Sequence, residues 1–333
     1  MRSLLAALLF WVAACAHPLT QTQLTGDPQT MASFEPEDSK FISFDGAELG
    51  LTVWPSTTSE EPEMVILGVH GMNDYADAFH LAAPWFAEHG VTTYAYDQRG
   101  FGRSPNFGIW PDEELMREDF RTAVKLTRAR HPDAILTVVG ISMGGAMSMT
   151  AFASDDPPVG VDRLVLSGPG LRGWGALPKL WRASLWLSTH VRPNWVVVPP
   201  KGVKIEPSDN VEMLRRAWAD PLKQKSNRID QVYGVITLME HAHEAAPNMP
   251  ASLPTLLTYG ARDIVVPPRG LKRTGPILPP HVRTAYYEKG YHMLLRDLQA
   301  ETVYADMLAF MKDPSAQLPS GASPLPWLAE NAH

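Results

Sequence analysis

Short runs dominated by apolar and β-branched residues recur along this chain, and each ends in glycine, polar or charged residues. These runs occupy residues 64–69, 91–96, 135–141, 162–167, 255–260 and 282–287. Runs of this kind are typical of strands buried on both faces of a sheet. Stretches with helical spacing lie between them, at 79–89, 112–130 and 301–311. Strands that alternate with helices at this pace predict a mostly parallel sheet covered on both faces.

Two further segments and one insertion complete the predicted organisation. Residues 41–46 and 49–54 alternate between apolar and polar positions, which predicts a hairpin. The composition changes at residues 171–250, so we expect the core to consist of 41–170 and 251–312, with the intervening segment as an insertion. Because the insertion follows the carboxyl end of a strand, we expect it to lie over that edge of the sheet as a lid.

Tryptophans concentrate in this insertion, and prolines interrupt it. The motif VVVPP at 196–200 ends any long helix, so several short helices are predicted. We expect some of the tryptophans to line a substrate pocket and the others to fill a small helical core. The tryptophans are Trp174, Trp181, Trp186, Trp195 and Trp218.

The amino terminus has the features of a bacterial secretory signal. Residues 1–16 start with a positive charge and continue with an apolar stretch of about eleven residues, too short to cross a bilayer. The motif VAAC at 12–15 resembles a lipobox, which predicts cleavage before Cys15 and a lipid on that cysteine. Ala16 follows, which favours the outer membrane of the cell envelope. Plain secretion or a periplasmic location, after cleavage at the same small residues, is the alternative.

Charge, cysteine content and local composition limit the possible partners and predict the character of the two ends of the chain. A formal charge of −7 without a basic run argues against nucleic acid as a partner. Cys15 is the single cysteine, which excludes an internal disulfide. Residues 17–40 are rich in Thr, Gln and Pro without a period and predict a tether, and the Pro/Ser/Ala-rich residues 313–333 predict a loosely ordered tail.

The motif GISMG at 140–144 lies between a predicted strand and a predicted helix. In that context G-x-S-x-G predicts a sharp, strained turn that exposes a nucleophilic Ser142 at a helix amino terminus. Glycines are needed two positions before and after the serine because neighbouring backbones crowd the turn. The alternative is a glycine-rich turn with an ordinary serine.

A serine nucleophile needs a base and an acid that orients the base. In strand–turn–helix hydrolases the chain order is Ser, Asp or Glu, then His, each after a strand. Asp263 and His292 satisfy that order, and the 29 positions between them leave room for one helix and one strand. Asp97 is the alternative acid, in a charge-paired turn, whereas His70 precedes Ser142 and would break the order.

The negative charge that forms on the substrate needs two preorganised N–H donors. We assign the backbone amide of Met143, directly after the nucleophile, and that of Met72, in the loop after the strand at 64–69. His241 and His243 form a lone H-x-H pair, which is usually a surface feature, so no metal site and no cofactor are predicted.

Five motifs resemble those of the α/β-hydrolases of the monoacylglycerol lipase and lysophospholipase group, in the family's order over residues 41–311. They are HGMND (70–74), DQRGFGRS (97–104), GISMGG (140–145), GARD (260–263) and YEKGYH (287–292). The resemblance implies the α/β-hydrolase fold, a mostly parallel eight-stranded sheet with helices on both faces and a helical cap. It implies the same catalytic and oxyanion-hole residues as the chemical argument. The insertion has no matching motif, so substrate identity does not carry over.

The expected activity is hydrolysis of carboxylic esters through an acyl-enzyme, because a serine nucleophile excludes the haloalkane dehalogenase and epoxide hydrolase branches. A monoacylglycerol or lysophospholipid is the expected substrate, since a membrane-anchored enzyme with a tryptophan-rich lid meets such molecules at a lipid surface. A short-chain esterase or thioesterase is the alternative. A non-catalytic envelope lipoprotein is less favoured, because all three chemical positions carry the right residue types. The oligomeric state is not predicted.

Overall fold

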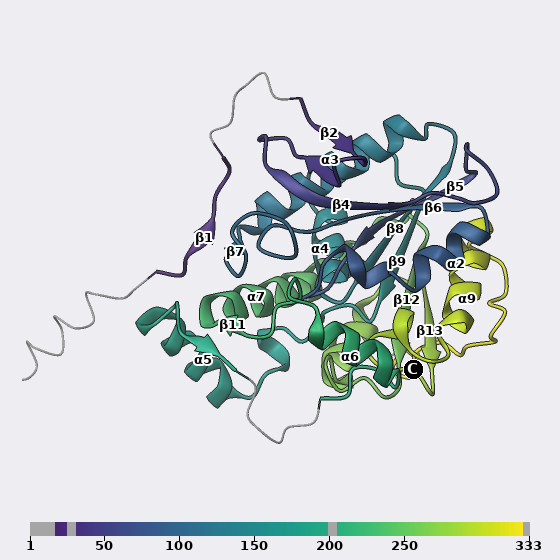
Figure 1. Ribbon diagram of the computed structural model, residues 1–333. Helices are drawn as coiled ribbons and strands as arrows, with labels where there is room; N and C mark the ends of the chain where they lie inside the picture. Colours follow the sequence, from purple (N-terminus) through teal and green to yellow (C-terminus); the bar gives the residue numbers. More distant parts are fainter. Residues whose placement is uncertain (1–16, 25–30, 199–204, 329–333) are drawn as a thin grey trace, which may run out of the picture.

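A nine-stranded sheet forms the centre of the computed structural model, which describes residues 17–24, 31–198 and 205–328. The strands are β2 (Ser33–Glu35), β3 (Lys40–Ile42), β4 (Glu48–Trp54), β5 (Met64–Val69), β6 (Val91–Tyr96), β8 (Ile135–Ile141), β9 (Arg163–Ser167), β12 (Thr255–Gly260) and β13 (Val282–Tyr287). Their order is β13-β12-β9-β8-β5-β6-β4-β3-β2, parallel from β13 to β6 and antiparallel beyond (Figure 1). The predicted mostly parallel sheet is confirmed, but eight strands is wrong, because β2 extends the edge by pairing with β3.

Helices cover both faces of the sheet (Figure 1). Along β5, Val65 and Leu67 face the core beneath α3 (Glu113–Arg130) and α4 (Met143–Phe152). Met64 and Ile66 face the core beneath α2 (Ala82–Glu88) and α9 (Ala300–Lys312). All four side chains are buried, as expected for a strand covered on both sides. The core helices are α2 (Ala82–Glu88), α3 (Glu113–Arg130), α4 (Met143–Phe152), α8 (Pro268–Thr274) and α9 (Ala300–Lys312), with short 3-10 turns η1 (Ala76–Phe79), η4 (Gly275–Ile277) and η5 (Leu294–Arg296).

The longest core helix, α3, begins and ends as its sequence predicts. Asp112 precedes it and accepts a hydrogen bond from the amide of Glu114, which satisfies one free N–H of the first turn. Leu115, Phe120 and Val124 are buried along one face. The helix therefore packs against the sheet through an apolar stripe with helical spacing.

The insertion contains the short helices that its sequence predicts and one two-stranded antiparallel sheet that it does not. The helices are α5 (Lys179–Val191), α6 (Val211–Ala219) and α7 (Ile229–Ala245), with 3-10 turns η2 (Trp174–Ala176) and η3 (Ala246–Asn248). The two-stranded sheet pairs β10 (Val196–Val197) with β11 (Asn227–Arg228), and α6 lies between these strands in the sequence. Helix α7 lies between α4 of the core and α5, so it joins the insertion to the core (Figure 1).

The amino-terminal segment is not the unstructured tether that its composition predicts. Strand β1 (Thr20–Gln21) pairs in parallel with β7 (Trp110–Pro111), and β2 belongs to the central sheet. These pairings use backbone hydrogen bonds, which need no period in the side chains. The predicted signal peptide and its predicted lipid attachment site, Cys15, lie outside the described residues. Within the described residues, no helix has both the length and the hydropathy to span a membrane.

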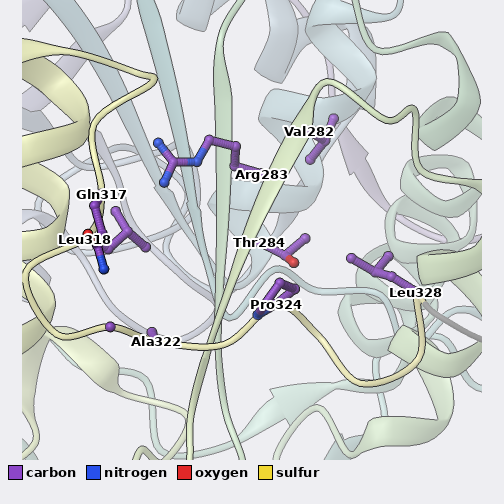
Figure 2. A pocket seen from close by; sticks show the side chains of 9 residues that line it. Val282, Arg283, Thr284, Gln317, Leu318, Ala322, Pro324 and Leu328 are labelled. Atoms are coloured by element: carbon purple, nitrogen blue, oxygen red, sulfur yellow. The ribbon is translucent and has the colours of Figure 1, made fainter.

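The carboxy-terminal tail also packs, against β13, rather than being loosely ordered over its described part. Ser323 forms an antiparallel bridge with Tyr286, and the side chain of Leu325 is buried. Figure 2 shows the tail passing β13 beside a hollow of about 340 Å³, with Arg283, Thr284 and Pro324 among its lining residues. None of the predicted catalytic residues lines this hollow.

Candidate active site

The backbone turns sharply at Ser142, between the end of β8 and the start of α4. Its φ of 50° lies in the left-handed region, which a residue with a side chain adopts only when its surroundings hold it there. The side chain is buried, and its amide donates to the carbonyl of Ser167 at 3.0 Å. The turn expected from the G-x-S-x-G motif is therefore present.

The two glycines of the motif are required by close packing of the backbone. A Cβ added to Gly144 would lie 2.2 Å from the carbonyl oxygen of Val69, and one added to Gly140 would lie 2.8 Å from the carbonyl oxygen of Gly144. Such contacts are far inside van der Waals distance, so no larger residue fits. The crowding inferred from the sequence is the geometry observed.

Asp263 and His292 form a buried pair at the ends of adjacent strands. Nδ1 of His292 lies 2.7 Å from Oδ2 of Asp263. The other carboxylate oxygen accepts from the amides of Val265 and Val266, both at 2.8 Å. A carboxylate held on both oxygens keeps its partner ring in one orientation and one tautomer, with Nε2 left to exchange a proton. The structure thus brings together two residues that lie 29 positions apart.

The loop after β9 connects this pair to Ser142, and sequence reasoning missed it. A Cβ on Gly168 would lie 3.5 Å from Nδ1 of His292 and 3.8 Å from Oδ2 of Asp263. Two residues later, the amide of Gly170 donates to the carbonyl of Ser142 at 2.8 Å. Gly168 also has a positive φ of 51°. The motif SGPG at 167–170, directly after a buried strand, was the signal that could have found this loop.

The loop after β5 places Gly71, the residue before Met72, beside the nucleophile. A Cβ on Gly71 would lie 3.1 Å from Cβ of Ser142. His70 accepts at Nε2 from the amide of Gln98 at 2.9 Å, so its Nδ1 carries the proton and donates to the carbonyl of Gly71 at 2.8 Å. That carbonyl belongs to the same planar peptide unit as the Met72 N–H, so fixing one fixes the other. The Met72 N–H donates no hydrogen bond to any backbone carbonyl in the part of the chain that the structure describes.

His70 is therefore a structural residue of this loop, with both ring nitrogens in use. Burial lowers its pKa, which keeps the ring neutral and preserves the tautomer that orients Gly71. Asp97, the alternative acid, accepts from Arg103 Nε at 2.8 Å and from the amide of Ala76 at 2.9 Å. Its carboxylate is thus committed to the charge-paired turn that the sequence indicated.

The remaining histidine pair lies apart from these groups. His241 contacts Glu113 at 2.6 Å and His243 contacts Thr274 at 2.9 Å. In the part of the chain that the structure describes, no group of three or more His, Cys, Asp or Glu side chains is arranged to hold a metal ion. The structure links Ser142 to the histidine–carboxylate pair through the loop at 168–170, which contacts both.

An apolar groove of about 550 Å³ lies between α5 and α7. Its apolar lining consists of Leu177, Leu180, Trp181, Leu185, Trp195, Val197, Ile229, Val232 and Ile236. The three residues from α7 have i, i+3, i+7 spacing, and Met239 continues the same face. Cε of Met239 would lie 2.9 Å from a Cβ on Gly170, which bonds to Ser142. The lining face of α7 therefore leads from the groove to the nucleophile.

Comparison with known proteins finds monoacylglycerol lipases and esterases. The chain is 24% identical over 286 residues to a monoacylglycerol lipase of Mycolicibacterium smegmatis, covering 84% of this chain and 99% of that protein. The structure of Paleococcus ferrophilus monoacylglycerol lipase aligns with a TM-score of 0.65 and 22% identity over 79% of this chain and 98% of that one. A thermostable carboxyl esterase from Bacillus coagulans, solved with glycerol, aligns with a TM-score of 0.68 and 22% identity over 85% and 99%.

These structural likenesses show the α/β-hydrolase fold. A family model described as "Serine aminopeptidase, S33" matches residues 60–299, which include β5, the elbow, the insertion and the loop that carries His292. The match extends over more than half of the chain. This protein belongs to that family of serine hydrolases.

Proposed function

We propose that this protein hydrolyses carboxylic esters through an acyl-enzyme, with Ser142 as nucleophile, His292 as base and Asp263 as the acid that orients it. The observation that carries the proposal is the buried Asp263–His292 pair, held against the same 168–170 loop that bonds to Ser142. Met72 and Met143 supply the backbone N–H groups for the oxyanion. Each group lies in a loop after a strand or at the start of a helix, where contacts with neighbouring backbone hold it.

The reaction follows from this arrangement. His292 Nε2 takes the proton of Ser142 as the hydroxyl oxygen attacks the ester carbon, and the Met72 and Met143 amides stabilise the charge on the former carbonyl oxygen. The intermediate collapses, and His292 returns the proton to the departing alcohol. Water then attacks the acyl-enzyme by the same route and releases the carboxylic acid.

The proposed substrate is a lipid with a single acyl chain, such as a monoacylglycerol or lysophospholipid. The groove between α5 and α7 supports this, because its lining is mostly apolar and its α7 face continues to Met239 beside the nucleophile's loop. The names of the related proteins also point to monoacyl glycerides. A short-chain esterase or thioesterase has the same catalytic groups and is the alternative within this chemistry.

A chain-length series of p-nitrophenyl esters tests the substrate class. A maximum at long acyl chains is expected for a lipase, whereas a maximum at acetate would favour a short-chain esterase, and no turnover at any length would favour a binding protein. Because the family description names an aminopeptidase, amino-acid p-nitroanilides are the necessary comparison. Faster turnover of these amides than of any ester would contradict the proposal.

The nucleophile has its own test. Ser142→Ala is expected to lose about 10⁶-fold in turnover, because removing one member of such a triad removes the work of the whole. A fluorophosphonate should label the wild type at Ser142 and leave the variant unlabelled. Full activity in the variant would exclude Ser142 as the nucleophile.

We also propose that a lipid on Cys15 anchors the protein in the bacterial cell envelope, most simply at the outer membrane. The described chain supports this geometry, because Leu19, four positions after Cys15, donates its amide to Asp230 at the start of α7. An anchor at Cys15 would therefore join the fold beside the insertion. Metabolic labelling with a palmitate analogue should mark the wild type but not Cys15→Ser, and equal labelling would exclude the lipid.

A further inference from the structure

The loop that carries Met72 is held in place largely by the insertion. Asn73, which has a positive φ of 66°, accepts at its side-chain oxygen from Nδ2 of Asn227 at 2.7 Å and at its carbonyl from the amide of Gln224 at 3.1 Å. The hydroxyl of Tyr75 donates to Asp220 at 2.8 Å. All three partners lie between α6 and α7. One short segment of the insertion thus binds the residues on both sides of Asp74, Asn73 through its backbone and side chain and Tyr75 through its hydroxyl.

A buried ion cluster lies at the centre of these contacts. Nζ of Lys223 lies 2.5 Å from Oδ1 of Asp74 and 3.0 Å from Asp77, and Nη2 of Arg296 lies 2.7 Å from Oδ2 of Asp74. Burial alone would raise the pKa of Asp74, but the charges of Arg296 and Lys223 outweigh it and hold the pKa well below its usual range. Losing one partner of a buried ion pair is costly, so this cluster tolerates little displacement.

The same insertion holds the loop that carries His292. Before α6, the carbonyl of Pro207 accepts from the amide of Met293 at 2.8 Å, and the side chain of Asp209 accepts from the amide of Leu298 at 2.8 Å. Arg296, which binds Asp74, lies in this loop too. Residues 207–227, which we name the α6 clip, therefore contact both catalytic loops. The residues before α6 contact the His292 loop, and those after α6 contact the Met72 loop.

We propose that the α6 clip is a fixed positioning element that sets the Met72 amide and the His292 loop relative to Ser142, with Lys223 as its central positioning residue. This inference rests on the assignment of Met72 as an oxyanion donor in the proposed function. Such donors must be preorganised at the place where charge develops, and a displacement of about 1 Å costs on the order of 10²-fold in rate. The α6 clip therefore stabilises the transition state and does not contribute to substrate binding.

The test is Lys223→Met in the full chain, assayed on p-nitrophenyl butyrate and with a fluorophosphonate. We expect kcat to fall by about 10- to 100-fold while KM changes less than about threefold, because the oxyanion exists only after attack. A trifluoromethyl ketone, which forms an oxyanion on Ser142, should bind more weakly by the same factor. Lys223→Arg should recover most of kcat, since it restores a cation between Asp74 and Asp77.

Lys225→Met is the matched control, because Lys225 lies in the same segment but contacts the Ala217 carbonyl and the Trp218 ring. If Lys223→Met does not fold, Asn227→Ala is the variant to use instead. It removes one hydrogen bond to Asn73 and should lower kcat several-fold. Unchanged kcat in Lys223→Met, or an equal loss in Lys225→Met, would overturn the proposal. Fluorophosphonate labelling of Ser142 needs no ester substrate, so it separates this proposal from the proposed function. If Lys223→Met slows the labelling but the wild type hydrolyses no ester, the positioning role of Lys223 stands and only the proposed substrate is wrong.

Discussion

At Ser142 the chain holds a strained conformation that its glycine neighbours make possible. The positive φ turns the hydroxyl out of the sheet, and the first turn of α4 must then pass within contact distance of the end of β5. Gly144 lies at that crossing. Strain of this kind persists only where the surroundings over-determine the backbone, which is the case here.

Gly144→Ala is therefore expected to be strongly destabilising. The new Cβ would meet the backbone carbonyls of Val69 and His70 at 2.2 and 2.7 Å, and backbone cannot move aside as a side chain can. We expect a loss of about 3 kcal/mol or more in the free energy of unfolding, measured by denaturant titration. Gly275→Ala is the control, since its Cβ would have one neighbour, Leu328 Cδ2 at 3.6 Å. Equal stability of the two variants would contradict the packing argument.

Asp297 makes stability depend on pH in an unusual direction. Burial raises its pKa to about 6, although its Oδ2 accepts from the amide of Tyr291 at 2.7 Å, next to His292. The folded state then binds this proton more tightly than the unfolded state, so the contribution of Asp297 falls as pH rises from about 4 to about 6. Asp297→Asn keeps an acceptor for Tyr291 and does not titrate.

The stability of Asp297→Asn relative to wild type should therefore increase between about pH 4 and pH 6 and then level off. Asp313→Asn should show the opposite slope at lower pH. Hydrogen bonds from Ser315 lower the pKa of Asp313, so its contribution to wild-type stability is present above about pH 4 and is lost as pH falls below that value. Chemical denaturation from about pH 3 to pH 7 measures both, and a difference for Asp297→Asn that does not vary with pH would exclude the raised pKa.

Strands buried on both faces could be predicted from the sequence. Very short strands, which are defined only by backbone hydrogen bonds to a partner strand, could not. Strands β5, β8, β9 and β12 appear as apolar runs because both of their surfaces leave water. Strands β2, β10 and β11 are two or three residues long and have no period, so only the partner strand defines each of them. The eight-stranded expectation failed at β2 for this reason.

The candidate site divides in the same way. Ser142, Asp263 and His292 follow predictable strands and carry side chains suited to the proposed chemistry, so order and residue type were enough to propose them. Lys223 and Arg296 belong to no motif. Their proposed role rests on ion pairs with Asp74, which bring together three segments that are far apart in the sequence. Contacts between loops far apart in sequence leave no local pattern.

At the scale of the insertion, Trp181 tests whether the groove holds an acyl chain. It lines the groove from α5, so Trp181→Ala should lower kcat/KM on the laurate ester by about tenfold, equivalent to about 1.4 kcal/mol, and leave the acetate ester unchanged. Trp186→Ala is the control, because Trp186 stacks on His190 and does not line the groove. An equal effect on both esters would show that the groove is not the acyl site.

Over the whole molecule, the amino-terminal arm and the insertion lie at the same end. Leu19 bonds to Asp230 of α7, and β1 pairs with β7 beside it (Figure 1). Helix α5 exposes more than half of each of five large side chains, Leu180, Trp181, Trp186, Leu187 and Val191. A patch of this kind is typical of a surface that meets a membrane or another protein. An anchor at Cys15 would hold that patch toward the lipid.

This arrangement predicts that α5 contributes to membrane binding independently of the anchor. In a Cys15→Ser background, the protein should still cosediment with phosphatidylcholine vesicles, which carry no net charge to oppose the protein's −7. Replacing Leu180, Leu187 and Val191 by serine should weaken binding at least tenfold, because each buried aliphatic side chain contributes about 1.5–3 kcal/mol. Val159→Ser is the control. It removes a comparably exposed apolar side chain that lies outside the insertion, so it should not change vesicle binding. Vesicle binding that is lost with Cys15 alone would show that the anchor, and not α5, holds the enzyme at its substrate.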